Sequence, residues 1–251
     1  NQCSSGTYQP SSGATDCIDA SPGYYVTDFS AIAQTPCEAG TYQMLSGANS
    51  CFQAGQGFYV PSEGSDSQEQ CQPGTFSSQQ GQAICTDASA GYFVDGIQQS
   101  SQSPCQPGEF QNLEGQTSCL PTTPGNYTDT EGSANQNQCS PGTYQPESGQ
   151  TSCIAAEPGY FSELGATSQT QCQNGTYSSE SGQGSCPPAE PGFFVELDGA
   201  TGPIPCPPGQ FQSEPGSSEC EPPPPGQVAS PDGSTTVSCP AGKYQPGDRS
   251  I

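Results

Sequence analysis

The chain has 251 residues, of which only 29% are hydrophobic, while 32 glycines and 27 prolines together make up almost a quarter of it. This composition excludes an ordinary hydrophobic core. The 25 acidic residues are balanced by only two basic ones, Lys243 and Arg249, and the net charge is −23. Because phosphate binding uses clustered lysine and arginine, nucleic acid is not expected as a partner.

The cysteines divide the chain into repeats. A short interval, as from Cys3 to Cys17, alternates with a longer one, as from Cys17 to Cys37, and the longer one loses a single residue in only two places. A period this regular predicts a repeat array in which each unit contacts mainly its neighbours. The predicted repeats are 3–36, 37–70, 71–104, 105–138, 139–171, 172–205 and 206–238, followed by the start of an eighth at 239–251.

Glycine and aromatic residues keep constant places within the repeat. A glycine always follows the first cysteine by three residues, as at Gly6, and an aromatic residue follows two positions later, as at Tyr8. A second glycine precedes the loop-closing cysteine by four residues, as at Gly13. These glycines predict turns with positive φ or a close approach of another chain segment.

A period of half this length underlies the repeat. Shifting the sequence by half a repeat places the first cysteines on Ala20, Ala54, Ala88, Thr122, Ala156, Ala189 and Pro223. The same shift places the second cysteines on Gln34, Gln68, Gln102, Gln136, Gln169, Pro203 and Thr236. We infer two half-modules per repeat, one stapled by a disulfide and one in which a small residue faces, in most repeats, a glutamine.

Local disulfides follow from this half-module argument. The predicted pairs are Cys3 with Cys17, Cys37 with Cys51, Cys71 with Cys85, Cys105 with Cys119, Cys139 with Cys153, Cys172 with Cys186 and Cys206 with Cys220. The alternative links the second cysteine of one repeat to the first cysteine of the next. Cys239 lacks a partner within the sequence, so we expect either a continuation of the chain beyond Ile251 or a pair between molecules.

The predicted fold class is small and disulfide-rich, mostly β-hairpin and loop with little or no helix, arranged as an elongated tandem-repeat rod. A disulfide that closes a loop of about 15 residues contributes roughly 3 kcal/mol, so one per repeat replaces a conventional core. Such cysteine use implies an oxidising compartment and an extracellular or cell-surface location. No stretch is long and apolar enough to span a membrane, and the start of the sequence is not a signal peptide.

Paired aromatic residues, such as Tyr24 and Tyr25, are expected to point to opposite faces of an extended segment. The inner ring of each pair would belong to a small core. The outer rings, at Tyr24, Phe58, Tyr92, Tyr160 and Phe193, are candidates for contact with sugar or a neighbouring rod, although stacking within the array is the simpler interpretation. In the seventh repeat, Pro222 to Pro225 are expected to form a stiff linker or a contact strip, of which the linker is the preferred interpretation.

Two sequences are acceptors for N-linked sugar, Asn126-Tyr127-Thr128 and Asn174-Gly175-Thr176. Both fit a secreted protein and predict that Asn126 and Asn174 lie on the surface with glycans attached.

We find no pattern of residues that predicts catalysis or a cofactor. The chain has no histidine and no Cys-x-x-Cys, which argues against zinc and thioredoxin-like sites. A calcium site is a weaker alternative, because no Asp-x-Asp run recurs. The acids occupy different places from repeat to repeat, so no carboxylate pair stands out for glycoside hydrolysis. We therefore expect no metal, no cofactor and no enzymatic activity.

The run C-x-x-G-T-Y, followed by G-x-x-x-C and P-G-Y-Y, resembles the cysteine-rich tandem repeats of ephrin-receptor-like and tumour-necrosis-factor-receptor-like ectodomains. Similar repeats occur in protist and algal surface proteins. Members of that group usually carry a Cys-x-x-Cys junction, whereas this chain has C-I-D-A at Cys17 to Ala20. Its near-identical units look like those of a structural rod, such as the subunits of flagellar hairs (mastigonemes). The resemblance implies a structural subunit of an extracellular filament that assembles with copies of itself; the alternative is the stalk or ligand-binding ectodomain of a receptor or adhesin.

Overall fold

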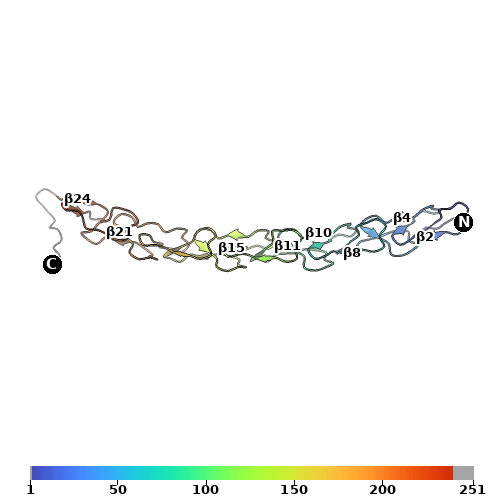
Figure 1. Cartoon of the computed structure of the whole chain (residues 1–251), viewed down its shortest axis with the longest axis horizontal. Helices are drawn as coiled ribbons and strands as arrows, with labels where there is room; N and C mark the ends of the chain where they lie inside the picture. The colour runs from blue at the N-terminus through green and yellow to red at the C-terminus, as the bar shows by residue number, and fades with distance from the viewer. Residues whose placement is uncertain (1, 240–251) are drawn as a thin grey trace. The chain divides into compact units, whose positions relative to one another are not determined.

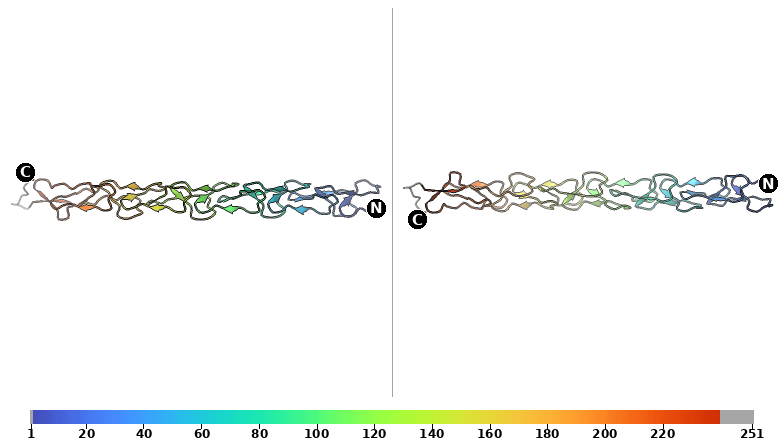
Figure 2. Two further views of the ribbon diagram at one scale, coloured as in Figure 1. Left: turned by 90° about the horizontal axis from the view of Figure 1, so that it is seen from below. Right: turned by 90° about the horizontal axis from the view of Figure 1, so that it is seen from above.

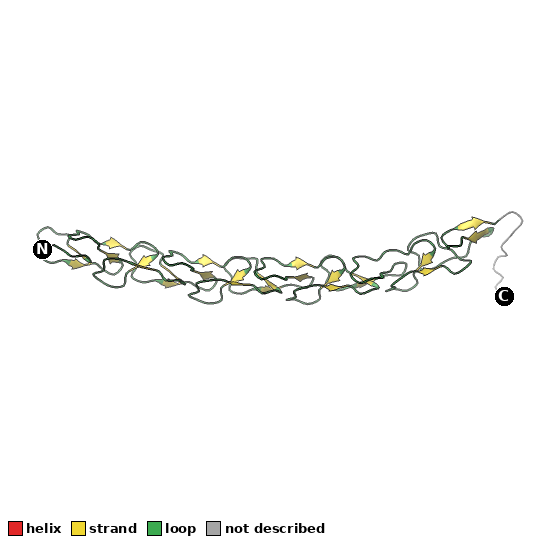
Figure 3. Cartoon of the chain, turned by 180° about the vertical axis from the view of Figure 1, so that it is seen from behind, coloured by secondary structure: helices red, strands yellow, loops and turns green. Residues whose placement is uncertain are grey.

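The computed structural model describes residues 2–239, and all its regular secondary structure in this range is short β-strand. Consecutive strands pair into two-stranded antiparallel sheets, so each half-module with named strands is one β-hairpin (Figure 3). No helix occurs among these residues. The prediction of small disulfide-rich hairpins and loops is confirmed.

The hairpins recur through the described part of the chain. Those of the first four repeats are β1 (Thr7–Tyr8) with β2 (Ile18–Asp19), β3 (Tyr24–Tyr25) with β4 (Thr35–Pro36), β5 (Thr41–Tyr42) with β6 (Phe52–Gln53), β7 (Phe58–Tyr59) with β8 (Glu69–Gln70), β9 (Thr75–Phe76) with β10 (Thr86–Asp87), β11 (Tyr92–Phe93) with β12 (Ser103–Pro104), β13 (Glu109–Phe110) with β14 (Leu120–Pro121) and β15 (Asn126–Tyr127) with β16 (Asn137–Gln138). Those of the last three are β17 (Thr143–Tyr144) with β18 (Ile154–Ala155), β19 (Tyr160–Phe161) with β20 (Thr170–Gln171), β21 (Phe193–Phe194) with β22 (Ile204–Pro205) and β23 (Gln227–Ala229) with β24 (Thr236–Ser238). Isolated bridges between Thr176 and Pro188 and between Phe211 and Glu221 mark the two remaining hairpins.

The chain forms two compact units, Asn1–Leu120 with Thr130–Asn135 and Pro121–Asp129 with Gln136–Ile251. Within the first unit the hairpins from β1 to β12 follow one another in chain order, as the change from blue to green shows (Figure 1). Within the second unit the hairpins from β17 to β24 do the same (Figure 2). Each unit is therefore a stack of sequential hairpins.

A tight turn opens each hairpin and requires glycine. In the first half-module, the N–H of Thr7 donates to the carbonyl of Ser4 at 3.0 Å, and Gly6 between them has a φ of 88°. This is the geometry of a type II turn, whose third residue needs positive φ. The corresponding glycine has a φ between 77° and 90° in every half-module of the described chain.

Backbone hydrogen bonds join each half-module to the next. The N–H of Gly6 donates to the carbonyl of Val26 at 2.8 Å, and the N–H of Ala20 donates back to the carbonyl of Gly6 at 2.9 Å. The N–H of Gly47 in the third half-module then donates to the carbonyl of Ala20 at 2.8 Å. Equivalent bonds recur from one half-module to the next, so the stack is held by backbone polar groups in place of a large apolar interior.

Most of the buried side chains are small. The first cysteine of each of the first six repeats is buried, and so are the alanines that replace it in the other half-module, such as Ala20 and Ala54. Val26, Val60, Val94 and Val195 are buried directly after the first strand of their hairpins. Both aromatic residues of strands such as β3 and β11 are half-buried. Burial therefore does not separate an inner from an outer ring in these strands, and both rings lie partly packed against the array.

The seventh repeat also differs from the prediction. Pro222 to Pro225 do not form a linker, because the N–H of Gln227 donates to the carbonyl of Pro224 at 3.0 Å and closes the same turn. Strands β23 and β24 follow with three residue pairs. Proline suits the second position of this turn, because its ring fixes φ at the negative value that the position requires. The hairpin persists without its two aromatic residues.

Candidate functional site

Seven disulfides staple alternate half-modules, and each joins cysteines 14 residues apart within one loop. Their Cα atoms are 5.7 to 5.8 Å apart, within the usual range. The pairs are Cys3–Cys17, Cys37–Cys51, Cys71–Cys85, Cys105–Cys119, Cys139–Cys153, Cys172–Cys186 and Cys206–Cys220. The structure therefore contains the local set of pairs and not links between repeats.

Glutamine replaces the disulfide in five of the unstapled half-modules. The Oε1 atom of Gln68, for example, accepts a 2.7 Å hydrogen bond from the backbone N–H of Gly55, which follows the buried Ala54. The same bond joins Gln34 to Ser21, Gln102 to Ser89, Gln136 to Thr123 and Gln169 to Glu157, at 2.7 to 2.8 Å. A hydrogen bond thus closes the loop where the sequence has lost the covalent bond.

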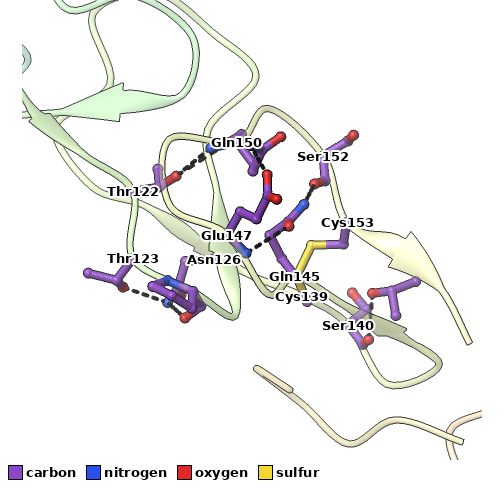
Figure 4. The surroundings of a disulfide bond; sticks show 12 residues. Thr122, Thr123, Asn126, Cys139, Ser140, Gln145, Glu147, Gln150, Ser152 and Cys153 are labelled. Atoms are coloured by element: carbon purple, nitrogen blue, oxygen red, sulfur yellow. Dashed lines mark hydrogen bonds between the residues drawn. A yellow bond between two sulfur atoms is a disulfide. The ribbon is translucent and has the colours of Figure 1, made fainter. Parts of the chain in front are cut away.

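A second set of glutamines braces the stapled loops, and sequence reasoning missed it. In Figure 4, the Nε2 atom of Gln145 donates to the carbonyl of Ser152 at 2.8 Å, and its Oε1 atom accepts from the N–H of Glu147 at 3.1 Å. Both contacts cross the loop that Cys139–Cys153 closes. Equivalent bonds form in the other braced loops, from Gln9, Gln43, Gln111 and Gln212. The signal was available, since each of these glutamines follows the first cysteine by six residues.

The two predicted glycosylation sites have different environments. Asn126 lies half-buried in β15, and its Nδ2 atom donates to Thr123 Oγ1 at 3.1 Å and to the carbonyl of Pro124 at 3.3 Å (Figure 4). Thr128, the hydroxyl residue of that acceptor sequence, is fully buried. Asn174 is exposed at the second position of a tight turn, and Thr176 is half-buried at its end. The folded chain therefore presents Asn174 but not the Asn126 acceptor sequence.

Cys239 is half-exposed and makes no disulfide within residues 2–239. Its expected partner would follow it by the same interval that separates Cys3 from Cys17, at a position beyond Ile251 and outside the described residues. In the same range, no helix is long and apolar enough to cross a membrane.

The predicted outer rings, Tyr24, Phe58, Tyr92, Tyr160 and Phe193, are half-buried in first strands of their hairpins. One of their neighbours makes a specific polar contact. The hydroxyl of Tyr59 donates to Glu69 Oε2 across β7 and β8 at 2.7 Å, and this bond raises the pKa of Tyr59. Rings also pair with aliphatic residues across the stapled hairpins, as Tyr8 does with Ile18.

Three shallow hollows recur where an unstapled half-module meets the next stapled one. The first lies between Tyr25 and Cys51, the second between Tyr127 and Cys153, and the third between Phe194 and Cys220. We call them the junction hollows. Their ring stands at the second position of the first strand of its hairpin, whereas the candidate outer rings stand at the first position. Each hollow combines residues of two half-modules, so the period alone does not reveal it.

Comparison with known proteins supports the resemblance of the repeats. Residues 91–139, the second half of repeat three with all of repeat four, match the family described as tyrosine-protein kinase ephrin type A/B receptor-like. No curated protein matches the chain. Together with the seven disulfides, the family match indicates an extracellular or secreted protein with a receptor-like or structural ectodomain. The chain is an array of cysteine-rich tandem repeats that resemble the receptor-like modules of extracellular proteins.

Proposed function

We propose that the protein is a structural subunit of an extracellular filament, of the kind found in flagellar hairs, and that its partners are copies of itself. One observation carries this proposal. Large apolar side chains stand exposed directly after the second cysteine in four repeats, at Ile18, Phe52, Leu120 and Ile154. Contiguous exposed apolar patches mark interaction sites in soluble proteins.

The neighbours of these side chains enlarge the apolar patch. Tyr8 pairs with Ile18 across the hairpin, Tyr42 with Phe52 and Tyr144 with Ile154, and each of these tyrosines is half-buried. The ring of Tyr42 lies 6.0 Å from that of Phe52. We call this set the hairpin patches.

Repetition of the hairpin patches favours another copy as the partner. A surface that recurs at multiples of one repeat length is best matched by a surface with the same spacing, and several linked weak contacts together give strong binding. Acidic residues spread over the repeats oppose association by like-charge repulsion, which keeps single molecules soluble at low concentration. Association is therefore expected to strengthen with ionic strength.

Electron microscopy of the purified protein, made in an oxidising secretory host, tests the proposal. We expect filaments whose number rises with protein and salt concentration. Serine at all four patch positions, Ile18, Phe52, Leu120 and Ile154, removes the filaments. A control variant carries serine at Phe29, Ile32, Ile84 and Ile97, which are 52% to 76% exposed but lie outside the hairpin patches. Single molecules at the highest soluble concentration, or equal loss in the control, would contradict the proposal.

A second candidate is the stalk or ligand-binding ectodomain of a surface receptor or adhesin, which the match to the ephrin-receptor-like family favours. The full-length coding sequence distinguishes the two candidates, because a membrane span or anchor signal downstream of Ile251 would favour the stalk or ectodomain. We also infer that the chain is not an enzyme, since it has no histidine and its acidic residues do not occupy a constant position in the repeat. We also propose glycans at both acceptor sequences, with Asn174 more fully occupied than Asn126, because the acceptor residue Thr128 is buried.

A further inference from the structure

The three junction hollows are built from the same positions of the repeat. Aligning the repeats superimposes Tyr25, Tyr127 and Phe194, and likewise Cys51, Cys153 and Cys220. The volumes are about 320, 320 and 350 Å³, at the lower end of the range for small-molecule sites. The same hollow forms three times, although the sequences that line it differ between repeats. The fold at this junction therefore produces the hollow.

The apolar part of each junction hollow is an aromatic ring and a disulfide. In the first hollow these are Tyr25 and the Cys51 end of Cys37–Cys51, and in the second they are Tyr127 and the Cys153 end of Cys139–Cys153. The rings are half-buried, so part of each ring remains accessible. Aromatic rings combine a large contact area with little conformational freedom, which suits them to binding sites.

The polar part of the first hollow is mostly uncharged. It consists of Thr27, Thr41, Asn49 and Ser50, with one carboxylate, Glu38. The hydroxyl of Thr41 donates to the carbonyl of Glu38 at 2.7 Å, so its oxygen is left to act as a hydrogen-bond acceptor.

The second hollow repeats this chemistry. It presents Ser140, Thr143, Thr151 and Ser152 with one carboxylate, Asp129. Thr143 donates to the carbonyl of Ser140 at 2.8 Å, as Thr41 does to that of Glu38. Figure 4 shows Ser140 and Ser152 beside the Cys139–Cys153 disulfide.

A glutamine holds the loop that forms one wall of each junction hollow. Gln43 donates to the carbonyl of Ser50 at 2.8 Å, Gln145 to that of Ser152 at 2.8 Å and Gln212 to that of Glu219 at 3.0 Å. Gln43 and Gln145 are only 4% and 3% exposed. The wall is therefore ordered before any ligand arrives, which lowers the entropic cost of binding.

We propose that the first two junction hollows bind single sugar rings of an uncharged, hydroxyl-rich polysaccharide. The aromatic ring and disulfide contact the C–H face of the sugar, and the hydroxyl, amide and carboxylate oxygens bond its hydroxyl groups. Anionic sugars are disfavoured, because Glu38 and Asp129 lie in the hollows and the chain carries a net charge of −23.

Shallow sites can bind a polymer tightly when it occupies several of them at once. Each site buries little of its ligand, so a single site binds weakly. A polymer that reaches two sites of one chain gains about 100-fold or more in overall affinity when its length matches their separation. This activity is independent of filament formation, since the hollows do not include the hairpin patches.

Two other junctions of the chain can be compared with the first two junction hollows. At the junction of repeats two and three, the positions equivalent to Thr27, Asn49 and Ser50 are Pro61, Ala83 and Ile84, and Ser77 replaces the bracing glutamine. That junction lacks the polar wall and serves as a matched control. Asn174 lines the third hollow, so a glycan attached there would begin beside that hollow.

The experiment uses the disulfide-bonded protein with Asn126 and Asn174 changed to glutamine, which removes attached glycans. Cellohexaose, chitohexaose and mannohexaose serve as neutral probes, and a galacturonate hexamer serves as the anionic one. Binding is followed by NMR shifts of the Asn49 side-chain amide and of the Tyr25 and Tyr127 rings. We expect at least one neutral probe to shift these signals with saturation and the anionic probe to leave them unchanged.

Variants of exposed residues separate binding from folding. Thr27→Val with Asn49→Ala in the first hollow, and Asp129→Asn with Thr151→Val in the second, each weaken the response of their own hollow by about tenfold. Gln72→Ala at the control junction leaves both responses unchanged. Failure of all three neutral probes, equal binding of the galacturonate hexamer, or an equal loss in the control overturns the proposal. If filaments still form in these variants, a failure of sugar binding does not count against the proposed filament function.

Discussion

Gly40 and Gly81 lie so close together that a Cβ atom on Gly40 would stand 2.1 Å from the carbonyl oxygen of Gly81. The two residues belong to half-modules that are two apart in the chain. Since Gly40 also has a φ of 87°, it combines a turn that disfavours side chains with a contact that excludes them.

Gly40→Ala is therefore expected to lower the free energy of unfolding by about 3 kcal/mol, because the backbone of one half-module must move to admit the methyl group. Gly13→Ala is the control. Gly13 has a φ of 85°, but a methyl group added there would meet no atom within 4 Å, so the loss should be about 1 kcal/mol. Urea unfolding of both variants measures the difference, and equal losses would show that the close contact does not contribute.

Ala54 and Gln68 occupy the positions that two cysteines occupy in the stapled half-module. Ala54→Cys with Gln68→Cys should form an eighth local disulfide and stabilise the chain by about 3 kcal/mol, less the hydrogen bond that Gln68 now makes to Gly55. Non-reducing peptide mapping identifies the bond, and thermal unfolding with and without reductant measures its effect. Free thiols at both positions after oxidation would refute the equivalence of the two half-modules.

Gln68→Ala alone removes the hydrogen bond without replacing it. The free energy of unfolding is expected to fall by about 1 kcal/mol, since the Gly55 N–H can still form a hydrogen bond with water. Gln72→Ala, at an exposed turn position, is the control and should change stability by less than about 0.5 kcal/mol. A loss from Gln68→Ala no larger than that of the control would mean that the loop does not depend on this contact.

Asn174 and Asn126 should differ in sugar occupancy. Asn174 is exposed in its turn, whereas Asn126 donates to Thr123 and Pro124 and its acceptor threonine, Thr128, is buried. Mass spectrometry of protein from a glycosylating secretory host should find Asn174 more fully occupied. Thr123→Ala removes one hydrogen-bond partner of the Asn126 side chain. It should raise the glycan occupancy of Asn126 only if local folding limits glycosylation at this site. Higher occupancy at Asn126 than at Asn174 in the unmodified sequence would contradict this interpretation of the two sites.

Because of the hydrogen bond from Tyr59 to Glu69, the stability of the fold should depend on pH in the alkaline range. The bond raises the pKa of Tyr59 above its ordinary value of 10.0, because the protonated phenol is the donor to the carboxylate. The stabilisation is therefore complete below the pKa of the unfolded chain and is lost as pH rises through the folded pKa. NMR titration of the tyrosine ring carbons should show the pKa of Tyr59 falling in Glu69→Gln, and Tyr59→Phe assigns the signal. An unchanged titration in Glu69→Gln would show that the contact is absent in solution.

The sequence by itself determined the hairpin repeat, the local disulfides and the glutamine that stands in for the missing bond at Gln34 and Gln68. These features lie within one half-module, where a short loop with a turn glycine near each end leaves the chain little choice of closure. The bracing glutamines, such as Gln145, were equally visible in the period but were overlooked.

Only the tertiary structure decided which equivalent positions meet. The contact of Gly40 with Gly81, the partial exposure of both rings in pairs such as Tyr24 and Tyr25, and the junction hollow between Tyr25 and Cys51 all join different half-modules. A periodic sequence states which residues are equivalent. It does not state the rotation and rise from one half-module to the next, which depend on the packing of buried small side chains such as Cys37 and Ala54 and on the backbone hydrogen bonds around them.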